Sequence, residues 1–177
     1  NLLKSGKKVK INKSTLGIEL EVCYQVKKTF FTSKGLVTMK NISRHILNMA
    51  TCIEVVGYRQ RKKGITSFGD LCIDFGANVK FLLGNKKKYK KINIGNLRTN
   101  ISNKKINLNV DGNTNSVYIN PLNSLKFVLN KLKKDKINID KNFWVFTGST
   151  VGVVPIKGKG IYKGYIEKLG SVKAIIN

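Results

Sequence analysis

The sequence predicts a mostly β fold of the α+β class, in which a strongly curved or closed sheet carries a few helices on its outside. Many short segments alternate apolar and polar residues, as half-buried strands do. Two stretches, 41–52 and 120–136, place apolar residues at helical spacing. Glycines divide the last third of the chain into short pieces, as the tight bends of such a sheet require. These patterns together favour a sheet that bends back on itself.

The first half of the chain centres on a strand expected from Leu16 to Val26, after a polar and basic lead-in at 1–13. Ile42, Ile46 and Met49 then recur at helical spacing, which predicts an amphipathic helix over 41–52 that also carries the single histidine, His45. A buried strand is expected next, at 53–56.

The second half is expected to alternate short strands with one more helix. Asn120-Pro121 predicts the start of this helix, with Asn120 as N-cap and Pro121 in the first turn. A turn is expected at Asp111-Gly112. The short apolar or alternating segments that we interpret as strands are 71–74, 81–84, 92–94, 106–110, 116–119, 143–147, 151–156, 161–166 and 172–176.

One domain, spanning 1–177, accounts for the whole chain. A length of 177 residues and an apolar fraction of 41% suit a single domain with a substantial core. No apolar run reaches the ~18–20 residues of a membrane-spanning helix, so no membrane partner is expected. Cys23, Cys52 and Cys72 lie in apolar settings, which indicates buried thiols in a reducing intracellular compartment, the mitochondrial matrix or the cytoplasm.

Two carboxylates share one face of the predicted strand Ile18-Glu19-Leu20-Glu21-Val22. Side chains alternate along a strand, so Glu19 and Glu21 point one way with Cβ atoms about 6–7 Å apart, at ~3.3 Å per residue. A third glutamate, Glu54, also lies in an apolar run. Hard oxygen donors at this spacing suit one divalent cation. The alternative is an edge strand with Glu19 and Glu21 on its wet face, and the segment alone does not decide between the two.

The charge of the chain predicts a polyanionic partner. There are 34 lysines and arginines against 9 acidic residues, a net charge of +25. An AT-rich coding source would enrich lysine, but it would enrich glutamate as well, and the chain has only four. We therefore expect RNA or a ribonucleoprotein assembly as partner, contacted mostly through its phosphates.

Three basic segments are the candidate nucleic-acid contacts, because long side chains in loops and at a helix end reach phosphates easily. Tyr89, within the second segment, would either stack on an unpaired base or shield the loop. The candidate residues are Arg59, Arg61, Lys62 and Lys63; Lys86, Lys87, Lys88, Lys90 and Lys91; and Lys131, Lys133, Lys134 and Lys136.

Several motifs, taken in order, carry a family resemblance. They are Ile18-Glu-Leu-Glu-Val22, Ile53-Glu-Val-Val56, Asp74-Phe-Gly-Ala-Asn-Val-Lys-Phe-Leu-Leu-Gly84, the helix that begins at Asn120-Pro-Leu122, and Phe146-Thr-Gly-Ser149 with Val153-Val-Pro155 and Leu169-Gly-Ser-Val172. Together they resemble the fumarylacetoacetate hydrolase superfamily, most closely its 2-keto-4-pentenoate hydratase and 4-oxalocrotonate decarboxylase branch. The resemblance covers nearly the whole chain.

The resemblance implies a distorted β-roll or barrel whose mouth holds Mg²⁺ or Mn²⁺. The ligands would be Glu19, Glu21 and Glu54, and a small 2-oxo acid would bind through its carboxylate and keto oxygens. The residues that the resemblance places near that substrate are Asp74, Thr147, Gly148 and Ser149.

Departures from the family pattern weaken the implied chemistry. The hydratases carry a further N-terminal segment with a lysine that serves the reaction, and this sequence has no counterpart of it. The family's Asp-Ser-Arg after the third glutamate is Gly57-Tyr58-Arg59 here. Phe75 stands where the family has asparagine, and Lys80 where it has glycine. The metal ligands are thus kept while the groups that handle protons look depleted, so isolated chains are expected to show no turnover.

Three functions remain open from the sequence. The first is a non-catalytic scaffold of hydratase fold, with its cation site filled or empty, among the other protein subunits of an RNA-containing assembly such as a mitochondrial ribosome. The alternative is a working Mg- or Mn-dependent hydratase or decarboxylase of small 2-oxo acids. A homing-nuclease-like enzyme is a weaker third, since the acidic clusters at helix ends that it needs are absent.

Overall fold

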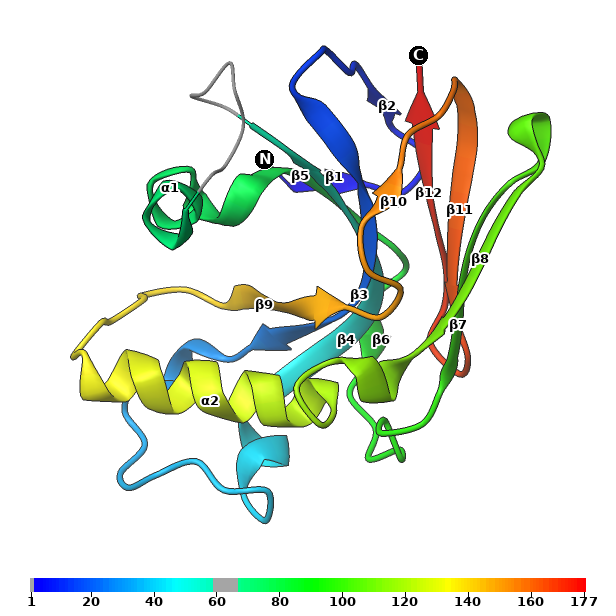
Figure 1. Ribbon diagram of the computed structural model, residues 1–177. Helices are drawn as coiled ribbons and strands as arrows, with labels where there is room; N and C mark the ends of the chain where they lie inside the picture. Colours follow the sequence, from blue (N-terminus) through cyan, green and yellow to red (C-terminus); the bar gives the residue numbers. More distant parts are fainter. Residues whose placement is uncertain (1, 59–66) are drawn as a thin grey trace.

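The computed structural model describes residues 2–58 and 67–177, which form two β-sheets (Figure 1). The first sheet has the order β1 (Leu2–Lys4), β5 (Asn78–Leu83), β4 (Ile46–Gly57), β3 (Thr15–Val26) and β10 (Val154–Pro155), with β6 (Lys87–Lys88) on β4 and β9 (Phe143–Ser149) on β3. The second has the order β2 (Lys8–Val9), β12 (Gly170–Ile176), β11 (Gly160–Ile166), β7 (Arg98–Asn103) and β8 (Leu108–Asn113). The mostly β prediction is confirmed, although the two sheets do not close into one barrel.

In the described residues two α-helices lie outside the sheets, α1 (Phe68–Ile73) and α2 (Pro121–Lys134). Asn120 caps α2 as predicted, because its side chain accepts hydrogen bonds from the backbone N–H groups of the next turn. Helix α2 runs alongside β9 (Figure 1). It buries Leu125 and Leu129. Neither helix, among the described residues, is long and apolar enough to cross a membrane. Short 3-10 turns lie at Lys28–Phe30, Ile42–His45, Phe75–Ala77, Lys104–Ile106 and Thr114–Ser116.

Strand β3 supplies one face to the main hydrophobic core, between the two sheets. Ile18, Leu20 and Val22 are fully buried there, which is the alternation that the sequence predicts. Opposite them, Gly164 of β11 approaches so closely that a Cβ on it would lie 2.4 Å from Leu20 Cδ1. The missing side chain lets β11 pack onto β3, and the outward face of β3 is left free for polar groups.

The predicted helix over 41–52 is wrong. A 3-10 turn at Ile42–His45 leads directly into strand β4, which begins at Ile46. Strand β4 lies between β3 and β5 and is buried on both faces from Met49 to Gly57. A strand buried on both sides has a continuous apolar run, and over a short window such a run also matches helical spacing.

Three smaller predictions also differ from the structure. The turn expected at Asp111-Gly112 lies inside β8, because the β7–β8 connection occurs earlier, at 104–107, where Asn107 adopts the left-handed region with φ 48°. Segment 71–74 falls largely in α1 rather than in a strand, and it exposes Cys72, whereas Cys23 and Cys52 are buried. Segments 92–94 and 116–119 contain no strand.

We predict that Leu20→Ala lowers the free energy of unfolding by about 2–5 kcal/mol, because it leaves a cavity between the sheets that Gly164 cannot fill. Urea denaturation followed by circular dichroism measures this. The matched control is Leu36→Ala, since Leu36 is 72% exposed, and its effect should stay within about 0.5 kcal/mol. Equal effects of the two substitutions would contradict the assigned core.

Candidate metal centre

Strand register brings three glutamates to one point on the outward face of the first sheet. Strands β3 and β4 pair antiparallel with Glu19 directly opposite Glu54, and Glu21 follows two residues later on the same face. One carboxylate oxygen from each of the three lies within 4.8 Å of the others. The predicted convergence of the three side chains is therefore confirmed. The edge-strand alternative is wrong, because β3 lies between β4 and β9 and Glu21 is only 2% exposed.

Burial and mutual repulsion make these carboxyl groups hard to ionise. Burial raises the pKa of Glu54 to about 10, together with its hydrogen bond to Glu21 and the charges of Glu21 and Glu19. Burial and the charge of Glu21 raise the pKa of Glu19 to about 7. Burial also raises the pKa of Glu21, against the lowering effect of its hydrogen bonds. At neutral pH, with no cation in place, Glu21 and Glu54 therefore share a proton.

Strand β9 adds a backbone donor to the centre. The N–H of Gly148 donates to Glu21 Oε2 at 2.9 Å. The β3–β9 register shifts between Glu21 and Cys23, and Gly148 has a φ of 106°, which side chains rarely tolerate. Such an irregularity re-aims a backbone group that a regular ladder would use for pairing. The hydroxyl of Thr147 donates to Val22 O at 2.7 Å and ties β9 onto β3 at this point.

The donor set fits a hard divalent cation. Three carboxylates offer oxygen ligands at one point, as Mg²⁺, Mn²⁺ and Ca²⁺ require. The ion pairs of the described residues are Arg98–Glu167 and Lys131–Asp135, and neither involves the three glutamates. Within that part of the chain, then, no side-chain cation offsets their charge, and a proton or a bound cation has to do so.

A cavity of about 490 Å³ opens over the three carboxylates. Its walls are mostly apolar, and Phe146 stacks on Phe81 with ring centroids 3.9 Å apart. Tyr58 and Asn78 are the polar side chains of the described lining besides the glutamates, and this lining has no lysine or arginine. The remaining lining residues are Leu16, Val56, Leu71, Gly76, Ala77, Gly148 and Val153.

Comparison with known proteins identifies the fold. No protein-family model matches the sequence, and curated protein sequences give no significant match. The structure resembles 4-oxalocrotonate decarboxylase from Pseudomonas putida G7, solved with magnesium and adipate, with a TM-score of 0.82 and 18% identity over 99% of this chain and 66% of that one. The chain has the fumarylacetoacetate hydrolase fold.

Hydrolases solved with manganese share this fold. Fumarylpyruvate hydrolase from Pseudomonas aeruginosa, with Mn²⁺ and pyruvate, has a TM-score of 0.66 and 12% identity over 99% of this chain and 73% of that one. Maleylpyruvate hydrolase from Sphingobium sp. SYK-6, with manganese(II) and pyruvate, has a TM-score of 0.63 and 12% identity over 99% and 60%. The chain thus spans just under two thirds of the length of the decarboxylase. The resemblance deduced from the motifs is confirmed at the level of the fold.

The predicted substrate residues have different places in this fold. Gly148 lines the cavity, as expected. The hydroxyls of Thr147 and Ser149 donate to backbone carbonyls, of Val22 and Gly152 respectively, and so support the loop. Asp74 is buried where α1 ends and does not line the cavity, although residues 76–78 after it do. Substrate contact by these residues stays a prediction.

Among the positions that depart from the family pattern, Gly57, Phe75 and Lys80 do not line the cavity, whereas Tyr58 does. A Cβ on Gly57 would meet Ser14 O at 2.5 Å, so no carboxylate side chain fits at this position. Lys80 stands opposite Val55, on the other face from Glu54. Phe75 is 69% exposed in the turn after α1. The expectation that these substitutions deplete the pocket of proton-handling groups stays a prediction.

Sequence reasoning missed the walls of the cavity. Tyr58, Leu71, Asn78 and Phe146 line it, but they come from four separate parts of the chain. In the strand expected at 143–147, alternation shows which residues share a face with Phe146, but it does not show what that face meets. Only the pairing of β9 with β3 shows that this is the face of Glu21.

Several of the candidate nucleic-acid residues are committed to contacts within the chain. Lys133 Nζ donates to the carbonyls of Ser33 and Gly35, at 2.8 Å each, and lies over the Phe30 ring. Lys131 pairs with Asp135 at 2.5 Å.

The segment 86–91 is also partly occupied. Lys87 Nζ donates to Lys168 O at 3.0 Å, and Lys86 Nζ lies 5.9 Å from the Trp144 ring centroid. Tyr89 packs edge-on against Tyr24 at 6.3 Å, which favours the shielding role over base stacking. Arg59, Arg61, Lys62 and Lys63 lie outside the described residues. RNA contact by these segments stays a prediction.

We predict that, in the presence of a chelator, the thermal midpoint falls as pH rises from about 5 to about 9. The folded-state pKa values of Glu19 and Glu54 lie above the unfolded value, at about 7 and about 10. The folded state therefore binds more protons than the unfolded state over this range, and stability is lost as pH rises. Glu54→Gln should flatten the curve, because it removes the group with the higher pKa, while Glu167→Gln should leave it unchanged. Parallel curves for all three proteins would contradict the assigned repulsion.

Proposed function

We propose that the chain is a divalent-cation-dependent enzyme that acts on a small 2-oxo acid. The observation that carries the proposal is the meeting of Glu19, Glu21 and Glu54 within 4.8 Å at the floor of a cavity of about 490 Å³. Structures of the same fold, solved with magnesium and adipate or with manganese and pyruvate, support it.

The three glutamates would hold Mg²⁺ or Mn²⁺. When bound, such an ion supplies Lewis acidity toward a carbonyl oxygen and a positive charge for a carboxylate. The chain's own residues prepare the place: the N–H of Gly148 fixes one oxygen of Glu21. The proton shared between Glu21 and Glu54 has to leave when the cation enters, so cation binding releases protons.

The cavity walls define the substrate class. The described lining has no lysine or arginine. The charge of a substrate carboxylate would therefore be neutralised by the cation that the three glutamates hold, rather than by a basic side chain. Leu16, Leu71 and Val153 offer apolar surface to the remainder of the molecule. The Tyr58 hydroxyl and the Asn78 amide are the polar groups of the described lining that can orient it. These features favour a short 2-oxo acid with an apolar or unsaturated tail, and the reaction classes that fit are decarboxylation and hydration.

A non-catalytic scaffold of the same fold would differ from an enzyme in turnover. A scaffold that keeps the fold by ancestry would bind the cation, and even a 2-oxo acid, without turning it over. Cation binding, acid binding and turnover are therefore measured separately.

We predict that the chain binds one Mn²⁺ and that Glu21→Gln weakens this binding at least about tenfold, because one of three oxygen ligands is lost. Isothermal titration calorimetry in two buffers of different ionisation enthalpy measures both the affinity and the released protons. Glu167→Gln is the matched control, since Glu167 is the one remaining glutamate and pairs with Arg98. Unchanged affinity in Glu21→Gln would remove the proposed centre.

We predict that pyruvate or oxalate binds only to the Mn²⁺-loaded protein, and that a panel of 2-oxo acids followed by proton NMR shows turnover of at least one member. Glu19→Gln should abolish that turnover, while Glu167→Gln should retain it. Manganese-dependent acid binding without any turnover would reject the enzyme and favour the scaffold. No acid binding with Mn²⁺ bound would reject the proposed substrate class while keeping the centre.

A further inference from the structure

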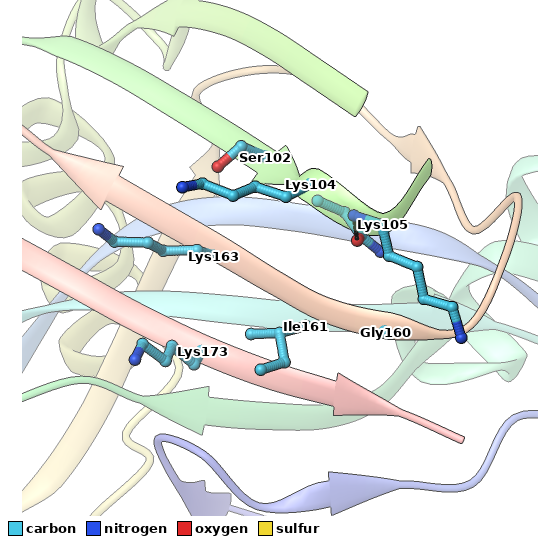
Figure 2. A pocket seen from close by; sticks show the side chains of 8 residues that line it. Ser102, Lys104, Lys105, Gly160, Ile161, Lys163 and Lys173 are labelled. Atoms are coloured by element: carbon cyan, nitrogen blue, oxygen red, sulfur yellow. Dashed lines mark hydrogen bonds between the residues drawn. The ribbon is translucent and has the colours of Figure 1, made fainter. Parts of the chain in front are cut away.

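The outer face of the second sheet is basic around β11 and β12, and Asp111, which shares this face, lies two strands away from β11 on β8. On β11, Ile161, Lys163 and Tyr165 point outward and are exposed, while the residues between them are buried. A hollow of about 550 Å³ lies over this face, and no carboxylate lines it (Figure 2). It lies on the second sheet, whereas the glutamate centre lies on the first.

Lysines from three neighbouring elements gather at this hollow. Lys163 of β11 stands directly opposite Lys173 of β12, and Lys104 follows the end of β7. Figure 2 shows the side chains of Lys104, Lys163 and Lys173 extending toward the same end of the hollow, whereas Lys105 extends away from them. Like charges directly opposite each other on adjacent strands destabilise a sheet. A bound anion would remove that repulsion.

Nearby acidic residues do not neutralise the lysines. Asp111 accepts a hydrogen bond from Asn100 at 2.8 Å, on the β8 side of the sheet. Glu167, just after β11, pairs with Arg98. The ion pairs of the described residues therefore include none of the lysines around the hollow.

A buried amide at the same hollow also lacks an acceptor. Asn103 lines it, is 1% exposed, and accepts the N–H of Lys105 on its Oδ1 at 3.1 Å. Its Nδ2 has no hydrogen-bond partner among the described residues. Asn103 belongs to the buried row of β7, with Thr99 and Ile101, so this amide lies beneath the lysine face. The ammonium groups on that face indicate a ligand that offers acceptor oxygens.

We propose that this face binds single-stranded RNA, with backbone phosphates on Lys104, Lys163 and Lys173 and a base stacked on Tyr165. The row of lysines crosses two strand spacings, about 10 Å at ~4.8 Å each, so it suits a chain of phosphates better than one small anion. Lysine acts as a point charge, which favours contact with phosphates over base reading. Tyr165 is 43% exposed on the same face, and an open sheet with an exposed aromatic ring is a platform for unpaired bases.

Fluorescence anisotropy with a labelled oligouridylate over a range of salt tests the lysines. The variant is Lys104→Gln/Lys163→Gln/Lys173→Gln. The matched control is Lys34→Gln/Lys40→Gln/Lys141→Gln, which changes three exposed lysines elsewhere and likewise lowers the net charge by three from +25. We expect about tenfold or greater loss of affinity near physiological salt in the variant, and a log–log salt slope smaller by about 2, at ~0.7 per phosphate contact. The control should lose less than about threefold.

Equal losses in the two triple variants would overturn the proposal, because affinity would then follow net charge alone. The thermal midpoint of the Lys104/Lys163/Lys173 variant should be no lower than that of the unmodified protein, since a repulsion is removed. Absent RNA binding, with vesicles rich in phosphatidylserine bound through the same lysines, would instead identify a membrane surface and reject RNA.

Substitutions of Tyr165 test the predicted base stacking independently of the lysines. Tyr165→Ala should weaken RNA binding by about five- to a hundredfold, whereas Tyr165→Phe should bind as the unmodified protein does, because the stacking surface is kept. Neither substitution touches the core, so their thermal midpoints should agree. Unchanged affinity in Tyr165→Ala would overturn the stacking.

Discussion

Three carboxylates share a space in which they cannot all be charged without a compensating cation. Glu19, Glu21 and Glu54 meet within 4.8 Å, and two of them are more than nine-tenths buried. The repulsion is imposed by the fold rather than by the side chains themselves. Sliding β3 by one residue against β4 would turn Ile18 and Leu20 outward, so burial of the core fixes the register that opposes Glu19 to Glu54. Core packing thus holds the three glutamates close together. A bound proton reduces the repulsion between their carboxylates in part, and a divalent cation reduces it more fully.

The two faces of β3 belong to different parts of the structure. One face joins the main core and is closed by the second sheet, which approaches closely at Gly164. The other face carries the glutamates and continues into a smaller apolar cluster around Cys23 and Cys52. The second sheet buries one of its own faces, and on the other face lysines surround a hollow that no carboxylate lines. The proposed cation site and the proposed RNA-binding face are therefore compatible within one chain, because they use opposite sides of a shared core.

How much the sequence could predict depended on whether the information was local. Alternation in β3 correctly placed Glu19 and Glu21 on one face, and Asn120 correctly marked the start of α2, because both depend on neighbouring residues. Strand β4 was mistaken for a helix, since its two-sided burial depends on β3 and β5, which lie elsewhere in the chain. The residues of the cavity walls could not be predicted for the same reason, because they come from separate parts of the chain. Lysine count predicted a polyanionic partner, but it could not show that Lys133 is held by backbone carbonyls while Lys163 is not.

Crystals grown with Mn²⁺, and measured at the manganese absorption edge, would show directly whether the three glutamates hold a cation. We expect one anomalous peak bounded by the carboxylates of Glu19, Glu21 and Glu54, at about 2.0–2.6 Å from an oxygen of each. We also expect the hydrogen bond between Glu21 and Glu54 to be gone, because its proton leaves with cation binding. No peak at millimolar Mn²⁺, with the two carboxyl groups still sharing a proton, would contradict the claim that the fold holds these glutamates together for a cation.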